Sequence, residues 1–259
     1  MNPKSIESYI VNWLSNYSKK SGLNGFVVGV SGGIDSAVTS TLCAKTGLNT
    51  IVLNMPIHQK SNQFDRSSEH INWLKNNFEN VSSHEINLTD VYDSFSNALP
   101  NANQDELSMA NLRSRIRMSN LYVFASNKKY LVAGTGNKVE DFGVGFYTKY
   151  GDGGVDISPI ADLLKSEVFK IADHLGIVSS IQKAKPTDGL WDDDRSDEDQ
   201  LGATYDELEW AMNYLEVNSQ DNLSERQKKV LEIYSGHHQS NRHKMNPIPV
   251  CEIPKSLRY

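Results

Sequence analysis

Short apolar runs alternate with longer amphipathic stretches along most of this chain. The short runs predict strands at 26–28, 50–55 and 130–133, and a further short strand is expected at 83–88. The longer stretches predict helices, at 36–45, 67–77, 106–126 and 163–175. Because strands alternate with helices, we expect an α/β fold, a doubly wound open parallel sheet with helices on both faces.

The N-terminal segment carries an apolar stripe at helical spacing, formed by Ile6, Tyr9, Ile10, Trp13, Leu14 and Tyr17. We expect this stripe to pack in the core or against another subunit, because its opposite face is not basic enough for a membrane-surface helix. The sequence has no apolar signal core and no segment as long as a membrane span. We therefore expect a cytoplasmic protein that has no membrane partner.

Composition narrows the function classes further. The 259 residues suffice for one large α/β domain with a substantial core. The formal net charge of −6 gives no indication of a nucleic-acid-binding face. The two cysteines, Cys43 and Cys251, are far apart and form neither a zinc motif nor a disulfide framework. A reducing compartment fits this cysteine usage.

The most informative segment follows the first predicted strand and reads Gly29, Val30, Ser31, Gly32, Gly33, Ile34, Asp35 and Ser36. Gly32 and Gly33 lack side chains, so the backbone can turn sharply and bring its N–H groups close to phosphate oxygens. The helix that follows adds partial positive charge at its first turn. Asp35 offers a carboxylate to a magnesium ion that accompanies phosphate. The segment therefore predicts a phosphate-binding turn.

This turn differs from the ordinary P-loop, which requires a lysine inside the turn. The order Ser-Gly-Gly-x-Asp-Ser instead resembles the pyrophosphate loop of the ATP pyrophosphatases, which split ATP into AMP and pyrophosphate. That resemblance implies a sheet of the adenine nucleotide alpha hydrolase type.

A second glycine-rich segment, 134–159, follows the fourth predicted strand. Ligands of open parallel sheets bind beyond the C-terminal strand ends, and both glycine-rich segments fall there. Thr135 can face a nucleotide at this edge, and Glu140 is a second hard oxygen ligand for magnesium. Lys149 and Lys165 are cations suited to phosphate or to charge that develops during phosphoryl transfer.

Four separated motifs give a more specific resemblance. They are the Ser-Gly-Gly turn and the segments 111–118, 134–159 and 185–188. In this order they resemble the NAD synthetase family, over nearly the whole chain from residue 26 to about residue 249. The block Tyr-Thr-Lys-Tyr-Gly-Asp-Gly-Gly within 134–159 is not expected in other ATP pyrophosphatases.

The resemblance implies conversion of deamido-NAD, ATP and ammonia into NAD, AMP and pyrophosphate, with Mg²⁺ as the metal. The nicotinate carboxylate would attack the α-phosphorus of ATP, and ammonia would then attack the resulting acyl-adenylate. The resemblance also implies a homodimer with active sites near the subunit interface. We expect a single synthetase domain over 1–259 with no glutaminase domain, while a separate glutaminase partner stays open.

The resemblance assigns roles by motif. The turn from Gly29 to Ser36 would hold the ATP phosphates, and Asp35 and Glu140 would bind magnesium. The remaining ATP contacts would come from Thr135, Lys165 and Thr187. Deamido-NAD would be contacted by Arg115, Lys149, Asp156, His243 and Lys244. The catalytic candidates are Lys165 and Asp152, the latter for the ammonia pocket.

Two other functions remain open. One is a different ATP pyrophosphatase, such as a GMP synthetase or a tRNA-modifying enzyme, that adenylates another acceptor. The other is a non-catalytic regulatory module that only binds ATP. A different ATP pyrophosphatase is disfavoured by the block Tyr-Thr-Lys-Tyr-Gly-Asp-Gly-Gly within 134–159, by the acidic charge and by the absence of thiolation cysteines. The retained carboxylates and lysines argue against the second.

The sequence also gives expectations for an acidic segment, an arginine cluster and a histidine pair. The acidic segment 189–199 is expected to be a solvated loop that acts as an active-site lid. Because residues two apart on a helix diverge, Arg113, Arg115 and Arg117 cannot all face one side. His237 and His238 are expected to flank a turn at Gly236 and not to bind zinc.

Overall fold

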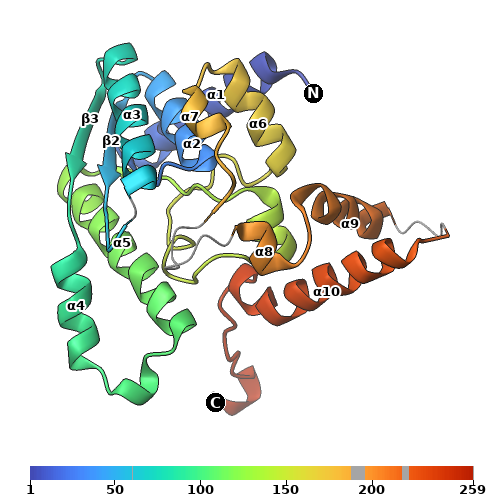
Figure 1. The fold of residues 1–259 in the computed structure, drawn as a ribbon. Helices are drawn as coiled ribbons and strands as arrows, with labels where there is room; N and C mark the ends of the chain where they lie inside the picture. The colour runs from blue at the N-terminus through green and yellow to red at the C-terminus, as the bar shows by residue number, and fades with distance from the viewer. Residues whose placement is uncertain (60, 188–195, 218–221, 259) are drawn as a thin grey trace.

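A computed structural model describes residues 1–59, 61–187, 196–217 and 222–258 (Figure 1). One sheet of four parallel strands has the order β3-β2-β1-β4. Its strands are β1 (Gly25–Gly29), β2 (Asn49–Asn54), β3 (Val81–Glu85) and β4 (Leu131–Val132). The predicted parallel α/β fold is therefore confirmed, and each predicted strand is present with shifted ends.

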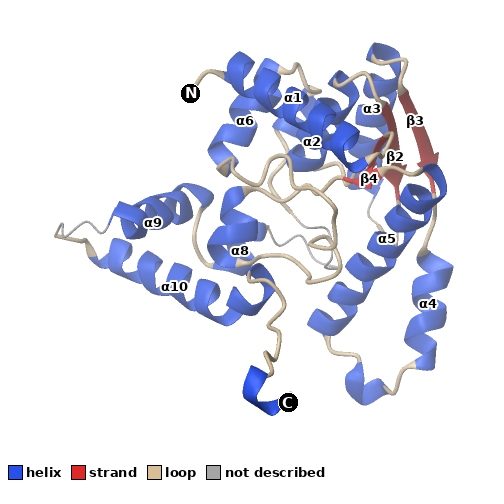
Figure 2. Cartoon of the chain, turned by 180° about the vertical axis from the view of Figure 1, so that it is seen from behind, coloured by secondary structure: helices blue, strands red, loops and turns tan. Residues whose placement is uncertain are grey.

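Side chains of the central strand alternate between two cores, as a half-turn per residue requires. Phe26 and Val28 are buried in one core, against α1 (Pro3–Ser21), α2 (Ile34–Lys45), α3 (Ser61–Asn77), α6 (Lys165–His174) and α7 (Ser179–Gln182). Val27 is buried in the opposite core, against α4 (Thr89–Ala98) and α5 (Glu106–Lys128). Both faces of the sheet are thus covered by helices (Figure 2).

A third core lies beyond the sheet and joins the C-terminal helices to a short π-helix. It packs η2 (Val139–Val144) against α8 (Asp197–Leu201), α9 (Tyr205–Val217) and α10 (Glu225–Met245). In Figure 1 these C-terminal helices form a group of their own beside the sheet. Two short 3₁₀ turns, η1 (Asn101–Asn103) and η3 (Lys255–Leu257), complete the elements of the described chain.

Several helix boundaries differ from the predictions. Helix α3 begins six residues before the predicted 67–77, because the apolar pattern marks only its buried second half. Helices α4, α9 and α10 were not predicted from the periodicity. The start of α10 did have a local signal, since Ser224 and Gln227 form a capping box. Among the described residues, no helix has both the length and the apolar character needed to cross a membrane.

The apolar stripe of α1 divides between core and surface. Ile10 and Leu14 are buried in the first core. Tyr9, Trp13 and Tyr17 remain exposed, with 73%, 36% and 39% of their surface accessible. Only part of the stripe therefore packs in the core.

This division gives a stability prediction for α1. Leu14→Ala is expected to lower the free energy of unfolding by about 2–5 kcal/mol, because it leaves a cavity in the core. Tyr9→Ala, on the exposed side of the same helix, is expected to change it by less than about 0.5 kcal/mol. Urea denaturation of both variants measures the difference. Equal effects would show that α1 does not belong to the cooperative core.

Candidate active site

A cavity of about 250 Å³ opens beyond the C-terminal ends of β1 and β4. It lies where the rule for parallel sheets places a ligand. Both glycine-rich segments line it, and α6 and α8 contribute Lys165 and Asp197. The cavity therefore lies between the sheet and the group of C-terminal helices.

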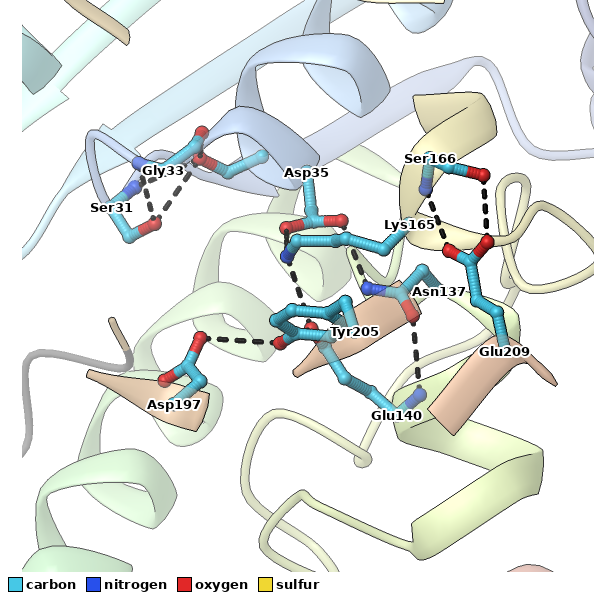
Figure 3. A network of polar contacts seen from close by, with 11 residues as sticks. Ser31, Gly33, Asp35, Asn137, Glu140, Lys165, Ser166, Asp197, Tyr205 and Glu209 are labelled. Carbon is cyan, nitrogen blue, oxygen red and sulfur yellow. Dashed lines mark hydrogen bonds and ion pairs between the residues drawn. The ribbon is translucent and has the colours of Figure 1, made fainter. Parts of the chain in front are cut away.

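The turn after β1 is held in shape by its own serines (Figure 3). Ser36 Oγ accepts from the Ser31 N–H at 3.2 Å and donates to the Gly33 carbonyl at 2.9 Å. Gly32 has φ +82°, and a Cβ there would lie 2.7 Å from the Gln63 carbonyl oxygen, so only glycine fits. Helix α2 begins at Ile34 with no side-chain cap, and its first residues line the cavity, so its uncapped N-terminus is suited to bind an anion there.

Three charged side chains from three different elements meet beside this turn. Lys165 Nζ lies 2.5 Å from Asp35 Oδ2 and 3.1 Å from Glu140 Oε1. Helix α2 begins two residues earlier than predicted, so it places Asp35 in its first turn, while η2 carries Glu140 and α6 carries Lys165. The lysine side chain is only 4% exposed.

Asn137 fixes both carboxylate-bearing segments. Its side-chain amide donates to Asp35 Oδ1 at 3.1 Å, and its amide oxygen accepts from the Glu140 N–H, also at 3.1 Å. Asn137 is fully buried. The two carboxylates therefore converge on Lys165 in a fixed geometry (Figure 3).

Burial and charge act in opposite directions on this group. Burial lowers the pKa of Lys165, but the carboxylates of Asp35, Glu140 and Asp197 outweigh it and raise the pKa above its usual value. Burial raises the pKa of Glu140, and the attraction of Lys165 offsets only part of that effect. Lys165 is accordingly a charged ammonium at neutral pH.

The same two carboxylates fit a magnesium ion that arrives with phosphate. Asp35 and Glu140 already converge on one cation, and carboxylate oxygen is the donor that Mg²⁺ prefers. In the described ranges, no cluster of three or more His, Cys, Asp or Glu side chains has the arrangement of a metal site. Mg²⁺ commonly takes one or two carboxylates and completes its shell with phosphate and water.

The other predicted ATP and catalytic residues line the same cavity. Thr135 and Thr187 lie on its wall, as do Lys165 and Asp152. Asp152 Oδ1 accepts from Ser114 Oγ at 2.7 Å and from the Thr148 N–H at 2.9 Å. The cavity thus brings together residues that are more than 150 positions apart in the sequence, from Gly29 to Thr187.

The five residues predicted to contact deamido-NAD have a different location. All five lie in the described part of the chain, but none lines the cavity. Lys149 joins two of the others, because its carbonyl accepts from Arg115 Nε at 3.4 Å and its Nζ donates to the His243 carbonyl at 2.7 Å. Lys244 donates to the carbonyls of Gly145 and Tyr147. These four residues form a basic cluster between α5 and α10.

Asp156 stands apart from that basic cluster. It accepts from Tyr122 Oη at 3.0 Å and from the Val132 N–H at 2.8 Å. Its carboxylate therefore anchors the segment after the second glycine-rich turn to β4. Each contact is an internal hydrogen bond of the fold.

The three arginines of α5 have different surroundings, as helical geometry requires. Arg113 lies over the Tyr92 ring, 5.0 Å from its centroid. Arg117 lines the cavity and donates from Nε to the Met55 carbonyl. Only Arg115 joins the basic cluster.

The predicted lid at 189–199 falls mainly on 188–195, which lies outside the described residues. The predicted turn at Gly236 is wrong, because His237 and His238 lie within α10. Their rings contact the carbonyls of Leu201 and Gly143, so both histidines connect α10 to its neighbours.

The sequence reasoning missed Asp141, which also lines the cavity. Its carboxylate fills the space beside Gly136, where an added Cβ would overlap it. Burial, followed by the nearby charges of Glu140, Asp152 and Asp35, raises the pKa of Asp141 to about 8. Its only sequence signal is its position next to Glu140.

The sequence model of the NAD synthase family matches residues 6–248. The chain belongs to the NAD synthase family. It is 37% identical to the NH(3)-dependent NAD(+) synthetase of Syntrophomonas wolfei, over 100% of both chains. It is 39% identical to that of Carboxydothermus hydrogenoformans, over 77% of this chain and 81% of the relative. The expected family is therefore confirmed.

Solved structures show the same relationship. The structure of NMN synthetase from Francisella tularensis has a TM-score of 0.85 and 32% identity, covering 98% of this chain and 99% of its own. That of NH3-dependent NAD synthetase from Campylobacter jejuni has a TM-score of 0.80 and 26% identity, covering 97% and 100%. The family fold therefore extends over nearly all of this chain.

The raised pKa of Asp141 predicts a pH effect on stability. Between about pH 4 and pH 8 the folded state keeps a proton that the unfolded state has released. The free energy of unfolding therefore falls as pH rises through this window, by at most about 1.4 kcal/mol per pH unit. Asp141→Asn removes this contribution. Urea denaturation in EDTA should show the variant gaining stability relative to the parent from pH 4 to pH 8, and parallel curves would contradict the prediction.

Lys165 gives a second stability prediction. Lys165→Met leaves Asp35 and Glu140 facing each other without a cation, and in EDTA it should cost roughly 3–5 kcal/mol of unfolding free energy. Added Mn²⁺ should restore part of that loss by binding the folded state. Lys45→Met, which removes a partly exposed ion pair with Glu7, is the matched control and should cost less than about 1 kcal/mol. Similar losses in the two variants would contradict the prediction.

Proposed function

We propose that this chain catalyses the ATP-dependent amidation of deamido-NAD by ammonia, which yields NAD, AMP and pyrophosphate. The observation that carries the proposal is the cavity where the Ser-Gly-Gly turn meets the convergent pair of Asp35 and Glu140. The family membership of residues 6–248 supports it. In this reading the enzyme is an ATP-binding ligase of NAD biosynthesis.

Different residues of the chain would bind different parts of ATP. The turn from Gly29 to Ser36 and the start of α2 bind the phosphates through backbone N–H groups. Thr135 and Thr187 contact the nucleotide from the facing wall. Asp35 and Glu140 would hold Mg²⁺, which would supply positive charge to the phosphates when bound. Lys165 then leaves the two carboxylates and stabilises negative charge on the reacting phosphate.

The reaction requires two successive displacements. The nicotinate carboxylate attacks the α-phosphorus of ATP, and pyrophosphate leaves toward the Ser-Gly-Gly turn. Ammonia attacks the carbonyl carbon of the acyl-adenylate, AMP leaves, and one ammonia proton is released. Asp152, fixed by Ser114 and the Thr148 N–H, orients the incoming ammonia. Positioning two nucleotides and excluding water are the main tasks of the protein.

We propose that deamido-NAD is shared between two copies of the chain. The basic cluster of Arg115, Lys149, His243 and Lys244 borders the cavity without lining it, since Lys244 Nζ lies 5.5 Å from the ring centroid of the cavity-lining Tyr147, and a dinucleotide is long enough to extend beyond the cavity toward a second copy. Asp156, which accepts from the Val132 N–H of β4, would also contact deamido-NAD. Exposed apolar side chains on α4 and α5 support a homodimer through these helices: Val91, Phe95, Leu107 and Val123.

The proposal also covers the domain organisation of the chain, its compartment and its nitrogen source. Residues 1–259 act as a single synthetase domain, a reading supported by full-length similarity to the Syntrophomonas wolfei relative. The protein works in the cytoplasm on free ammonia. Its net charge of −6 supports the absence of a nucleic-acid partner.

A mononucleotide acceptor is the second candidate. The solved structure with 32% identity and a TM-score of 0.85 is that of an NMN synthetase. That name supports nicotinate mononucleotide as an alternative acceptor for this chain. The two candidates share all chemistry at the phosphate turn and differ only in how much of the acceptor must be bound.

The test is a defined reaction of the purified chain with ATP, Mg²⁺ and ammonium. Deamido-NAD and nicotinate mononucleotide are supplied separately, and glutamine replaces ammonium in a parallel series. With deamido-NAD and ammonium we expect NAD and AMP in equal amounts. Asp35→Asn should lower kcat/KM for Mg·ATP roughly 100-fold, because it removes a metal ligand. Asp162→Asn, at a 99% exposed side chain in the same segment as Lys165, is the control and should leave it unchanged.

Other outcomes separate the alternatives. Faster amidation of the mononucleotide would favour the second candidate. AMP and pyrophosphate without an amide product would indicate another acceptor. ATP binding without cleavage would indicate a regulatory module.

A further inference from the structure

Tyr205 is a buried aromatic residue at the start of α9. It contacts Lys165 and Glu140, although it lies outside all four sequence motifs. It is only 5% exposed. Its hydroxyl donates to Glu140 Oε1 at 2.5 Å, and its ring lies 4.8 Å from Lys165 Nζ (Figure 3). One side chain therefore contacts both the carboxylate and the ammonium of the ion pair.

The single hydroxyl proton decides which carboxylate Tyr205 orients. Glu140 Oε1 lies at 2.5 Å from the hydroxyl oxygen, whereas Asp197 Oδ2 lies at 3.3 Å. A phenol has one proton to donate, and the shorter distance shows that the Tyr205 hydroxyl donates its hydrogen bond to Glu140. Glu140 Oε1 thus accepts from Tyr205 and from Lys165 at the same time.

These two donors behave differently when a metal ion enters. Lys165 competes with the metal, because both are cations that bind the same two carboxylates. Tyr205 is neutral and approaches from α9, so its hydrogen bond is compatible with a metal on the other lone pairs of Glu140. The hydrogen bond from Tyr205 would therefore persist on Glu140 if a metal ion replaced Lys165 at the two carboxylates.

Helix α9 is firmly attached to the site at a second point. Glu209, one helical turn after Tyr205, accepts from the N–H and the hydroxyl of Ser166 at 2.8 and 2.7 Å. Ser166 is the neighbour of Lys165 in the first turn of α6. Residues four apart share a helix face, so the same face of α9 contacts both Glu140 and the lysine-bearing turn (Figure 3).

We propose that Tyr205 is a positioning residue that fixes the Glu140 carboxylate for the metal ion of Mg·ATP. This inference rests on the proposed function for the metal, but not on the identity of the acceptor. Hydrogen-bond partners of metal-ligating carboxylates orient the ligand, and their loss commonly costs 10–100-fold in metal affinity or activity.

The test compares Tyr205→Phe with Tyr234→Phe. Tyr234 is a buried tyrosine of the same core, 6% exposed, and its hydroxyl has no hydrogen bond among the described residues. Both variants keep the aromatic ring and lose only the hydroxyl. The primary readout is Mn²⁺ binding by electron paramagnetic resonance, with α,β-methylene-ATP present so that no turnover occurs. We expect about tenfold weaker Mn²⁺ binding for Tyr205→Phe and no change for Tyr234→Phe.

A double-mutant cycle tests whether Tyr205 acts through Glu140. Glu140→Gln removes the ligand, so adding Tyr205→Phe to it should cost no further Mn²⁺ affinity. Turnover should show a raised KM for Mg²⁺ with kcat recovered at high Mg²⁺. A merely structural role would lower kcat and would add its full effect to that of Glu140→Gln.

Unchanged Mn²⁺ affinity in Tyr205→Phe, equal losses in the two tyrosine variants, or a parent that binds no Mn²⁺ would each overturn the proposal. Failure of the proposed function can be distinguished from failure of the positioning role of Tyr205. If the affinity pattern holds and no amide forms, Tyr205 still positions a metal ligand in an enzyme with another acceptor. If NAD forms and Tyr205→Phe binds Mn²⁺ normally, only the positioning role is lost.

Discussion

The buried contact of Lys165 with Asp35 and Glu140 is the interaction on which the site depends. It joins helix α2, the π-helix η2 and helix α6, which are built from distant parts of the sequence. A buried charge without a partner is costly, so these three elements must come together for any one of the side chains to be accommodated. The same requirement gives the site its chemistry, because two carboxylates held around one cation are suited to exchange that cation for another.

The parts of the fold and site that are encoded locally could be predicted from the sequence. Strands β1, β2 and β4 follow from short apolar runs, and the phosphate turn follows from the local order of Ser31, Gly32, Gly33, Asp35 and Ser36. The rule that parallel sheets bind ligands at their C-terminal ends brought the two glycine-rich segments together. Asp35 and Glu140 do converge on one cation, although their proposed role as metal ligands stays a prediction.

The parts that failed depend on contacts between distant elements. Tyr205 and Glu209 lie on a helix with no motif, and they reach the site only because α9 packs on η2 and α6. Helix α10 is too polar for apolar periodicity to mark it, so His237 and His238 were assigned to a turn. The contact of the basic cluster around Lys149 with the substrate stays a prediction, and the hydrogen bond from Lys149 to the His243 carbonyl is a contact between distant elements that no local motif marks.

The fit between Gly136 and Asp141 has a consequence for how this site can diverge. The carboxylate of Asp141 takes the volume that a side chain at position 136 would need. A side chain at Gly136 alone therefore meets a clash, whereas truncating Asp141 alone leaves a gap in the wall. The two positions form an epistatic pair, and lineages of this family should exchange them together, with a side chain at one position accompanied by a small residue at the other.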